Sequence, residues 1–296
     1  MQALWMLIAS FFFALMAVCV KVASQWYGSG ELVFWRGLLG MAFMWLLARQ
    51  RGMTLRTPLV SLHAWRSVSG VVSLWAWFYS IAGLPLATAM TLNYMSSVWV
   101  AAFLLGSALI AIRPGQPVFR QGPLALAVLA GFAGVVLMLR PTIDQDQLFA
   151  GLVGLFSGVL AAIAYLQVMA LGRLGEPEER TVFYFSAGSA LAGLVVLPFA
   201  GMAPWDWTQV PWLLAMGATA SAGQWCMTRA YSQGATLVVA SLQYSGLVFG
   251  AFFGVLLFDE TIAGIAWIGM ALILASGIAA TALSSRAAPD AAADDH

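Results

Sequence analysis

The sequence predicts an all-α integral membrane protein of about ten transmembrane helices, arranged as two inverted five-helix repeats. Of its 296 residues, 62% are hydrophobic and only 8% are charged, whereas a soluble domain carries roughly 25% charged residues. Long apolar runs follow one another along the chain, and one stretch of the first half recurs in the second half. A surface with so few charges could not face water, so these runs are expected to cross a membrane.

Ten apolar runs, separated by prolines, glycines and charged residues, are the expected membrane spans. They cover residues 4–23, 32–48, 67–82, 86–112, 124–139, 149–171, 181–197, 212–231, 236–258 and 262–283. A run of about 20 residues extends roughly 30 Å as a helix, which is the thickness of the hydrocarbon core. The first run has its lysine, Lys21, at its far end, so we interpret it as a retained span and not as a cleaved signal peptide. No proline falls near the middle of a run, so proline-broken helices are not expected.

An internal repeat relates the two halves of the chain. The stretch TLNYMSSVWVAAF of the first half recurs 150 positions later as SLQYSGLVFGAFF, and both copies hold a carboxamide followed by a tyrosine, Asn93–Tyr94 and Gln243–Tyr244. Five spans per repeat is an odd number, so the second copy enters the membrane upside down. Inverted repeats are a recurring plan of secondary transporters, whose substrate site lies near the midplane between the halves.

Arginine residues in the connecting loops predict the orientation. They gather in loops on one side of the membrane, at Arg49, Arg51, Arg56, Arg66, Arg113, Arg120, Arg173 and Arg180. The opposite side carries only Lys21 and Arg140. This asymmetry places both termini in the cytoplasm, and we expect a bacterial inner membrane. The chain is divided into a first repeat (1–142), an inverted second repeat (143–284) and a polar, disordered cytoplasmic tail (285–296).

Three short motifs resemble those of the EamA group in the drug/metabolite transporter superfamily. ELVFWRGLLG, which contains Arg36, resembles the span-two motif; FALMAVCVKVAS, which contains Lys21, is similar to the first-span signature; and LLFDET holds Glu260, where the family has a glutamate that closes the repeat. The first-half counterpart, LLGSALIAIR, lacks that glutamate. The resemblance extends to about Leu283 and looks closest to YddG-type exporters. It implies a carrier that exports aromatic and other neutral amino acids, including methionine- and threonine-like substrates, by alternating access.

Polar and aromatic side chains inside the spans are the expected substrate contacts, because an unsatisfied polar group in hydrocarbon is costly. The candidates are Asn93, Tyr94, Gln243, Tyr244, Tyr79, Trp99, Tyr165, Ser97, Ser245 and Gln224. The two carboxamide–tyrosine pairs are expected to face a central cavity, and Tyr79, Trp99 and Tyr165 to line it. Two alternatives stay open: a serine can bond the carbonyl of its own helix, and a carboxamide can join two helices without touching substrate.

Lys21, Arg36 and Glu260 are candidates for gating or charge roles near the non-cytoplasmic ends of their spans. Lys21 and Arg36 could instead extend to the membrane interface. Otherwise they could pair with an acidic residue or attract a substrate carboxylate at the outer mouth.

The sequence excludes several other chemistries. It has no GxxxxGK[ST] phosphate loop, and neither of its two histidines, His63 and His296, lies in a predicted span. We expect no enzymatic activity, no metal or cofactor, no nucleic-acid partner, and a monomer that moves a small molecule across the bilayer. Because no span interior holds an acidic residue or histidine, facilitated export is favoured over proton coupling. The alternatives are a carrier of phosphorylated or nucleotide sugars, which one lysine in the chain disfavours, and a lipid-modifying enzyme.

Overall fold

The computed structural model describes residues 2–96, 98–100, 102–103, 122–139, 145–233 and 242–291. The helices in these ranges are α1 Gln2–Ala23, α2 Ser29–Gln50, α3 Val60–Gly83, α4 Leu86–Tyr94, α6 Gly122–Leu139, α7 Gln145–Arg173, α8 Glu178–Ala200, α9 Val210–Gln233, α11 Ser245–Phe258 and α12 Gly264–Ala291. The described residues contain no strand, which confirms the all-helical prediction, and their ten helices fit the expected number of spans.

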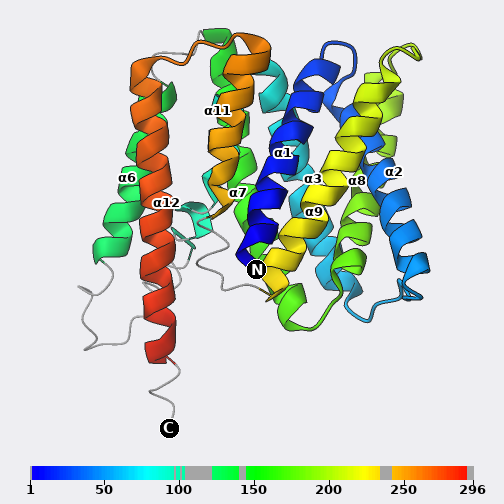
Figure 1. The fold of residues 1–296 in the computed structure, drawn as a ribbon, viewed down its shortest axis with the longest axis horizontal. Helices are drawn as coiled ribbons and strands as arrows, with labels where there is room; N and C mark the ends of the chain where they lie inside the picture. The colour runs from blue at the N-terminus through cyan, green and yellow to red at the C-terminus, as the bar shows by residue number, and fades with distance from the viewer. Residues whose placement is uncertain are drawn as a thin grey trace.

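The helices lie side by side and run up and down through the molecule (Figure 1). Helix α1 begins and α12 ends at the lower end of this view, so the start of α1 and the end of α12 lie on the same side of the bundle. Helices α2 and α8 form the right edge, and α6 and α12 form the left edge.

The helices of the two halves pack on one another in a regular pattern. Helix α1 packs on α9, α2 on α8, α3 on α7, α4 on α11, and α6 on α12. If the spans of each half are numbered one to five, the first span of either half meets the third span of the other. The second, fourth and fifth spans each meet their counterparts. A twofold relation between the halves would produce this pattern.

Small residues allow the paired helices to approach closely. A Cβ atom on Gly37 of α2 would lie 2.3 Å from the backbone nitrogen of Ala190 of α8, and a Cβ on Gly193 would lie 2.6 Å from Cα of Phe34. A side chain at either glycine would therefore force the backbones of α2 and α8 apart. Such small-residue contacts are typical of helix pairs in membranes, where van der Waals packing replaces the hydrophobic effect.

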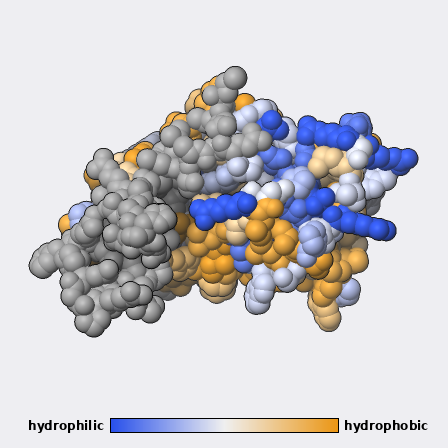
Figure 2. Space-filling model, turned by 90° about the horizontal axis from the view of Figure 1, so that it is seen from below, coloured by the Kyte–Doolittle hydropathy of each residue, from blue (hydrophilic) through white to orange (hydrophobic). Residues whose placement is uncertain are grey.

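The outside of the bundle suits a lipid environment. In the described part of the chain, four helical segments are long and apolar enough to span a membrane, at 4–23, 29–50, 147–173 and 178–200. Large apolar side chains are exposed on the outer faces, among them Phe43, Trp45, Leu194, Phe199, Val248 and Phe252. Figure 2 shows the lower end of the bundle, where hydrophilic side chains gather on the right, with apolar ones between and below them. The exposed arginines Arg49, Arg51, Arg56 and Arg173 belong to the segments that end or begin there.

Two expectations about helix bounds need correction. The span expected over 86–112 is not one uninterrupted helix, because α4 ends at Tyr94 and Met95 has φ −57° and ψ −11°. Helix α11 likewise begins directly after Tyr244, which has φ −66° and ψ −14°. Both breaks fall at the carboxamide–tyrosine pairs, and neither contains a proline. At Met95 and Tyr244 the ψ angle is rotated from the α-helical value toward that of a 3₁₀ helix. Residues 104–112 and 236–241, which complete the expected fourth and ninth spans, lie outside the described residues.

The C-terminal tail also differs from expectation. Helix α12 continues to Ala291, into the segment 285–296 that the sequence predicts to be disordered. This segment is rich in alanine, the residue with the highest helix propensity. Residues 292–296 lie outside the described part of the chain.

Candidate functional site

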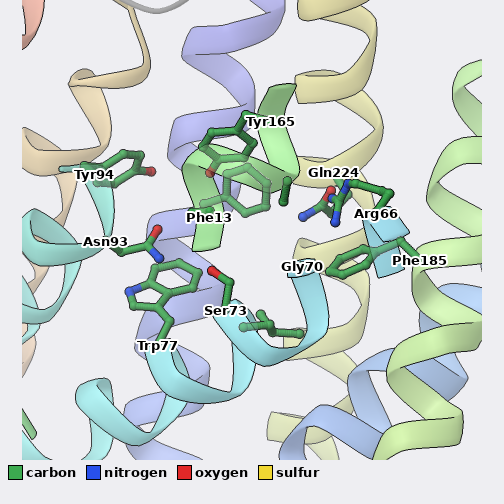
Figure 3. Close-up of a pocket in the computed structure, with 13 residues that line it drawn as sticks. Phe13, Arg66, Gly70, Ser73, Trp77, Asn93, Tyr94, Tyr165, Phe185 and Gln224 are labelled. Atoms are coloured by element: carbon green, nitrogen blue, oxygen red, sulfur yellow. The ribbon is translucent and has the colours of Figure 1, made fainter. Parts of the chain in front are cut away.

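A central pocket lies between helices of both halves (Figure 3). Its walls come from α1, α3, α4, α7, α8 and α9, and the lining residues are Phe13, Arg66, Gly70, Ser73, Leu74, Trp77, Asn93, Tyr94, Ala161, Ala164, Tyr165, Phe185 and Gln224. Five of these thirteen residues are aromatic, and a few polar groups converge among them, as is usual for small-molecule sites.

Four residues predicted from the sequence line this pocket: Asn93, Tyr94, Tyr165 and Gln224. Asn93 and Tyr94 lie on one side of it and Gln224 on the opposite side (Figure 3). Tyr94 packs on α11 at Gly246, where a Cβ would come within 2.4 Å of the phenol oxygen. The repeated tyrosine therefore depends on a glycine in the second half for its place in the pocket wall.

A hydrogen-bond network holds Asn93 in position. Its Nδ2 donates to Oγ of Ser157 over 3.1 Å. Ser157 in turn donates to the Gly154 carbonyl over 2.6 Å, and Ser73 of α3 donates to the Ser157 carbonyl over 2.8 Å. The network links α3, α4 and α7 at the pocket, so the buried carboxamide has a defined orientation.

The second carboxamide–tyrosine pair does not line the pocket, which corrects the expectation for Gln243 and Tyr244. Both are buried, at 2% and 1% exposure. Oε1 of Gln243 accepts a hydrogen bond from the Tyr231 hydroxyl over 2.7 Å. The ring of Tyr231 stacks on the pocket residue Tyr165, with centroids 6.0 Å apart. Gln243 therefore joins α9 to the start of α11 behind the pocket wall, which is the interhelical alternative that the sequence left open.

The other candidates lie outside the pocket or outside the described residues. Tyr79 is 42% exposed, and its ring meets Phe149 of α7 edge-on, so it faces away from the pocket. Trp99 is partly buried and is not among the lining residues. Ser245 donates to the carbonyl of Leu242 in its own helical turn over 2.7 Å. Ser97 lies outside the described residues.

Arg66 is a pocket residue that the sequence reading missed. It was assigned to a basic loop, but it lies in α3 and is only 3% exposed. Its Cζ lies 4.1 Å from the centroid of the Phe185 ring. A Cβ on Gly70 would lie 1.9 Å from its Nη1, so the absence of a side chain at Gly70 makes room for the guanidinium. An arginine four residues before a glycine on one helix face was the signal available in the sequence.

Arg36 of α2 approaches the same Phe185 ring. Its Cζ is 4.9 Å from the Phe185 centroid, and the residue is 2% exposed. The side chain therefore does not extend to the membrane interface, which corrects that alternative. Burial comes from the close packing of α2 on α8, which leaves Arg36 no path to solvent.

Lys21 and Glu260 form an ion pair at the end of the bundle opposite the arginine-rich loops. Nζ of Lys21 lies 2.8 Å from Oε1 of Glu260 and donates to the Leu84 carbonyl over 2.7 Å. The amide of Leu86 donates to both carboxylate oxygens, over 2.9 and 2.8 Å. Because Gly254 has no Cβ, the carboxylate fits against α11. The pair connects α1, the α3–α4 turn and the segment after α11.

A second polar cluster lies at the arginine-rich end. Glu176, between α7 and α8, contacts Nε2 of His63 over 2.9 Å, accepts a hydrogen bond from Thr57 and pairs with Arg180 over 2.6 Å. Burial would raise the pKa of the Glu176 carboxyl, but the hydrogen bonds from Thr57 and His63 and the charge of Arg180 outweigh it and lower the pKa below its ordinary value. His63 is buried in α3, and does not lie in the loop where the sequence reading placed it.

Comparisons with known proteins give transporters as relatives. No family model matches the sequence. The chain is 33% identical over 272 residues to the pseudopaline exporter CntI of Pseudomonas aeruginosa strain UCBPP-PA14, covering 92% of this chain and 93% of the relative. It is 28% identical over 286 residues to a riboflavin transporter of Rhizobium johnstonii, covering 93% and 89% of the two chains. A crystal structure that is 20% identical superposes with a TM-score of 0.66 over 96% of this chain and 98% of the other, and so shares the fold.

Proposed function

We propose a function from one premise: the chain belongs to the membrane transporter family that includes the pseudopaline exporter CntI. Its relatives are named as transporters or exporters, which favours a carrier over an enzyme. We propose that this carrier exports an amino acid or a small amino-acid-derived metabolite through the central pocket, with aromatic and other neutral amino acids as the first candidates.

The lining of the pocket is the observation that carries this proposal. The rings of Phe13, Trp77 and Tyr165 offer apolar faces on which a planar or thioether side chain can stack. Asn93 and Gln224 offer hydrogen-bonding groups on opposite sides of the pocket. Nε1 of the buried Trp77 has no hydrogen-bond partner among the described residues and remains available as a donor. A small amphipathic molecule matches this combination.

Export of pseudopaline itself is the second candidate. It is favoured by the 33% identity to CntI over nearly the whole length of both chains. Riboflavin, the named cargo of more distant relatives, completes the set of substrates to be compared.

Alternating access between inverted repeats is the proposed mechanism. The repeats are residues 1–142 and 143–284, and their proposed twofold relation is supported by the exchange of first and third spans in the helix contacts. The proposed location is a bacterial inner membrane, with both termini in the cytoplasm beside the arginine-rich loops. We propose facilitated export down the gradient of the substrate, without a cofactor and by a monomer.

Counterflow in proteoliposomes tests this function. Purified protein is reconstituted, and exchange of labelled phenylalanine, methionine, threonine, pseudopaline and riboflavin is measured with and without an imposed pH gradient. We expect exchange of the amino acids without a requirement for the pH gradient. Exchange of pseudopaline alone would select the second candidate, and concentrative uptake driven by the pH gradient would contradict facilitated export.

A variant of the pocket carboxamide makes the test specific. Asn93→Ala removes one neutral hydrogen-bonding group, which is worth about 0.5–1.5 kcal/mol, so we expect roughly two- to tenfold weaker apparent affinity. Gln50→Ala removes a carboxamide from the exposed end of α2 and serves as the matched control. Equal affinities of the two variants would remove Asn93 from the site.

A further inference from the structure

We infer that the pocket contains a carboxylate-binding subsite formed by Arg66, with Arg36 behind the Phe185 ring supplying a second positive charge. This inference rests on the proposed transport function and narrows its substrate to molecules with a carboxylate group. The sequence left open that Arg36 attracts a substrate carboxylate at the outer mouth, but neither the sequence nor the names of the relatives assign a subsite at Arg66 inside the pocket.

Two arginines are buried beside the pocket without a protein counter-charge among the described residues. Arg66 and Arg36 are 3% and 2% exposed. Nε and Nη1 of both residues have no hydrogen-bond partner among the described residues, and neither residue forms an ion pair there. Arginine does not lose its proton in proteins, so it cannot avoid the desolvation cost by becoming neutral. Buried charges in a membrane protein are generally paired, and those that are not mark substrate or ion pathways.

Acidic residues near the bundle ends are engaged elsewhere and do not neutralise these arginines. Four of them are Glu31, bonded to the Ala203 amide; Glu176, paired with Arg180; Glu179, paired with Arg51; and Glu260, paired with Lys21. The missing negative charge at the pocket is therefore best supplied by the ligand.

The ring of Phe185 brings the two guanidinium groups close together. Both guanidinium carbons approach this ring, at 4.1 Å for Arg66 and 4.9 Å for Arg36, so they are at most 9 Å apart, the sum of the two distances. Two like charges this close repel each other, and an anion beside them relieves the repulsion. The ring offers each cation a favourable π face, but it cannot accept the hydrogen bonds that their N–H groups need.

The polar groups of the pocket are divided between its two sides. Arg66 lies with Gln224 and Phe185 on one side, and Asn93 and Tyr94 lie on the other (Figure 3). A carboxylate at Arg66 would accept two parallel N–H bonds from the guanidinium fork, which matches its planar shape. The remainder of the molecule would then extend past Trp77 toward Asn93. Of the two arginines only Arg66 lines the pocket, so the ligand contacts one guanidinium fork, which matches one carboxylate.

Binding of matched acid and amide pairs to the purified protein tests the subsite. Calorimetric affinities of benzoate and N-acetyl-L-phenylalanine are compared with those of benzamide and N-acetyl-L-phenylalaninamide, which differ from them in charge but hardly in shape. We expect each acid to bind about 10- to 100-fold more tightly than its amide, because hydrogen bonds to a charged group are the strong ones. No preference for either acid would overturn the inference, and tighter binding of phenyl phosphate than of benzoate would overturn the assignment to carboxylates.

Three pocket-region variants and one control variant locate the preference. Arg66→Gln should abolish it, whereas Arg173→Gln, which removes an exposed arginine of α7, should keep it. Gly70→Ala keeps both charges but displaces the Arg66 guanidinium, so it should weaken acid binding at least severalfold and provides a second test if Arg66→Gln does not fold. Arg36→Gln should weaken acid binding by a smaller factor than Arg66→Gln. A preference that survives both Arg66→Gln and Gly70→Ala would refute the subsite.

The outcome is independent of the transport assay. If no amino acid is exchanged in proteoliposomes but the acid preference depends on Arg66, the carboxylate subsite stands and the proposed amino acid cargo fails. If amino acids are exchanged but acids and amides bind alike, the transport function stands and the subsite fails.

Discussion

Replacing Glu260 by glutamine should open the end of the bundle that lies opposite the arginine-rich loops. The carboxylate pairs with Lys21 over 2.8 Å and accepts two contacts from the Leu86 amide. Glutamine keeps the shape and one acceptor oxygen but removes the charge, so Lys21 loses its counter-ion. Nothing else in the described residues provides an acidic partner for Lys21 at this end.

The magnitude follows from partial burial of the pair. The side chains of Lys21 and Glu260 are 19% and 9% exposed, so the interaction lies between a surface pair of about 0–1 kcal/mol and a fully buried pair, whose disruption costs roughly 3–5 kcal/mol. We take about 2 kcal/mol as the loss. If the pair forms only when this end is closed, the ratio of open to closed molecules rises about 30-fold.

Cysteine labelling measures this shift. Ser73→Cys places a thiol in the pocket, in a background in which the buried Cys19 and Cys226 are replaced by alanine. A membrane-impermeant thiol reagent is applied to oriented vesicles from the side onto which the Lys21–Glu260 end of the bundle opens, and the labelling rate is compared with and without Glu260→Gln. We expect labelling to accelerate by up to about 30-fold.

Asp259→Asn is the matched control for this experiment. Asp259 is exposed, has φ +49° and forms no ion pair among the described residues, and asparagine tolerates that left-handed conformation. It therefore removes one negative charge beside Glu260 without breaking the contact to Lys21. Equal labelling rates in Glu260→Gln and Asp259→Asn would refute the role of the pair in closure.

Three further outcomes are expected. The pKa of Glu176 is lowered in the folded protein, so its contacts stabilise the fold fully above its ordinary pKa of 4.5. This stabilisation is lost as the pH falls through the lower folded value. The melting temperature of wild type should therefore exceed that of Glu176→Gln near pH 6, and the difference should shrink below about pH 4.5. Gly193→Val should separate α8 from Phe34 of α2 and lower the thermal stability by about 1–3 kcal/mol, measured by unfolding in detergent. Gly264→Val is the control, because nothing lies within 4 Å of a Cβ added at Gly264, so its stability should stay close to that of wild type. Tyr79→Phe should leave transport unchanged, because its ring lies outside the pocket; a loss of counterflow would contradict that placement.

Composition and periodicity along the chain were sufficient to predict the class of structure. A chain with 62% hydrophobic residues and runs of about 20 apolar residues leaves helices as the way to satisfy the backbone in a membrane. Asn93 and Tyr94 were also predictable as pocket residues, since a carboxamide deep in an apolar run needs a polar environment. These properties depend on residues close together in sequence, so no tertiary contact is needed to see them.

The rotation of each helix about its own axis was decided only by the tertiary structure. An almost wholly apolar helix has no polar face to show which side turns inward. The sequence therefore predicted Tyr79 as a pocket residue although it faces outward. It also predicted Gln243 as a substrate contact, although its Oε1 accepts a hydrogen bond from Tyr231.

Arg66 is the converse case, a pocket residue that the sequence did not indicate. An arginine near a span end reads as part of a loop, because the sequence does not reveal that Gly70 leaves space for it inside the helix bundle. Its burial against Phe185, on a helix more than 100 residues away, arises when α3 and α8 pack together. The sequence alone determined that the chain crosses the membrane as helices, whereas packing between distant helices decided which charges and rings meet at the pocket.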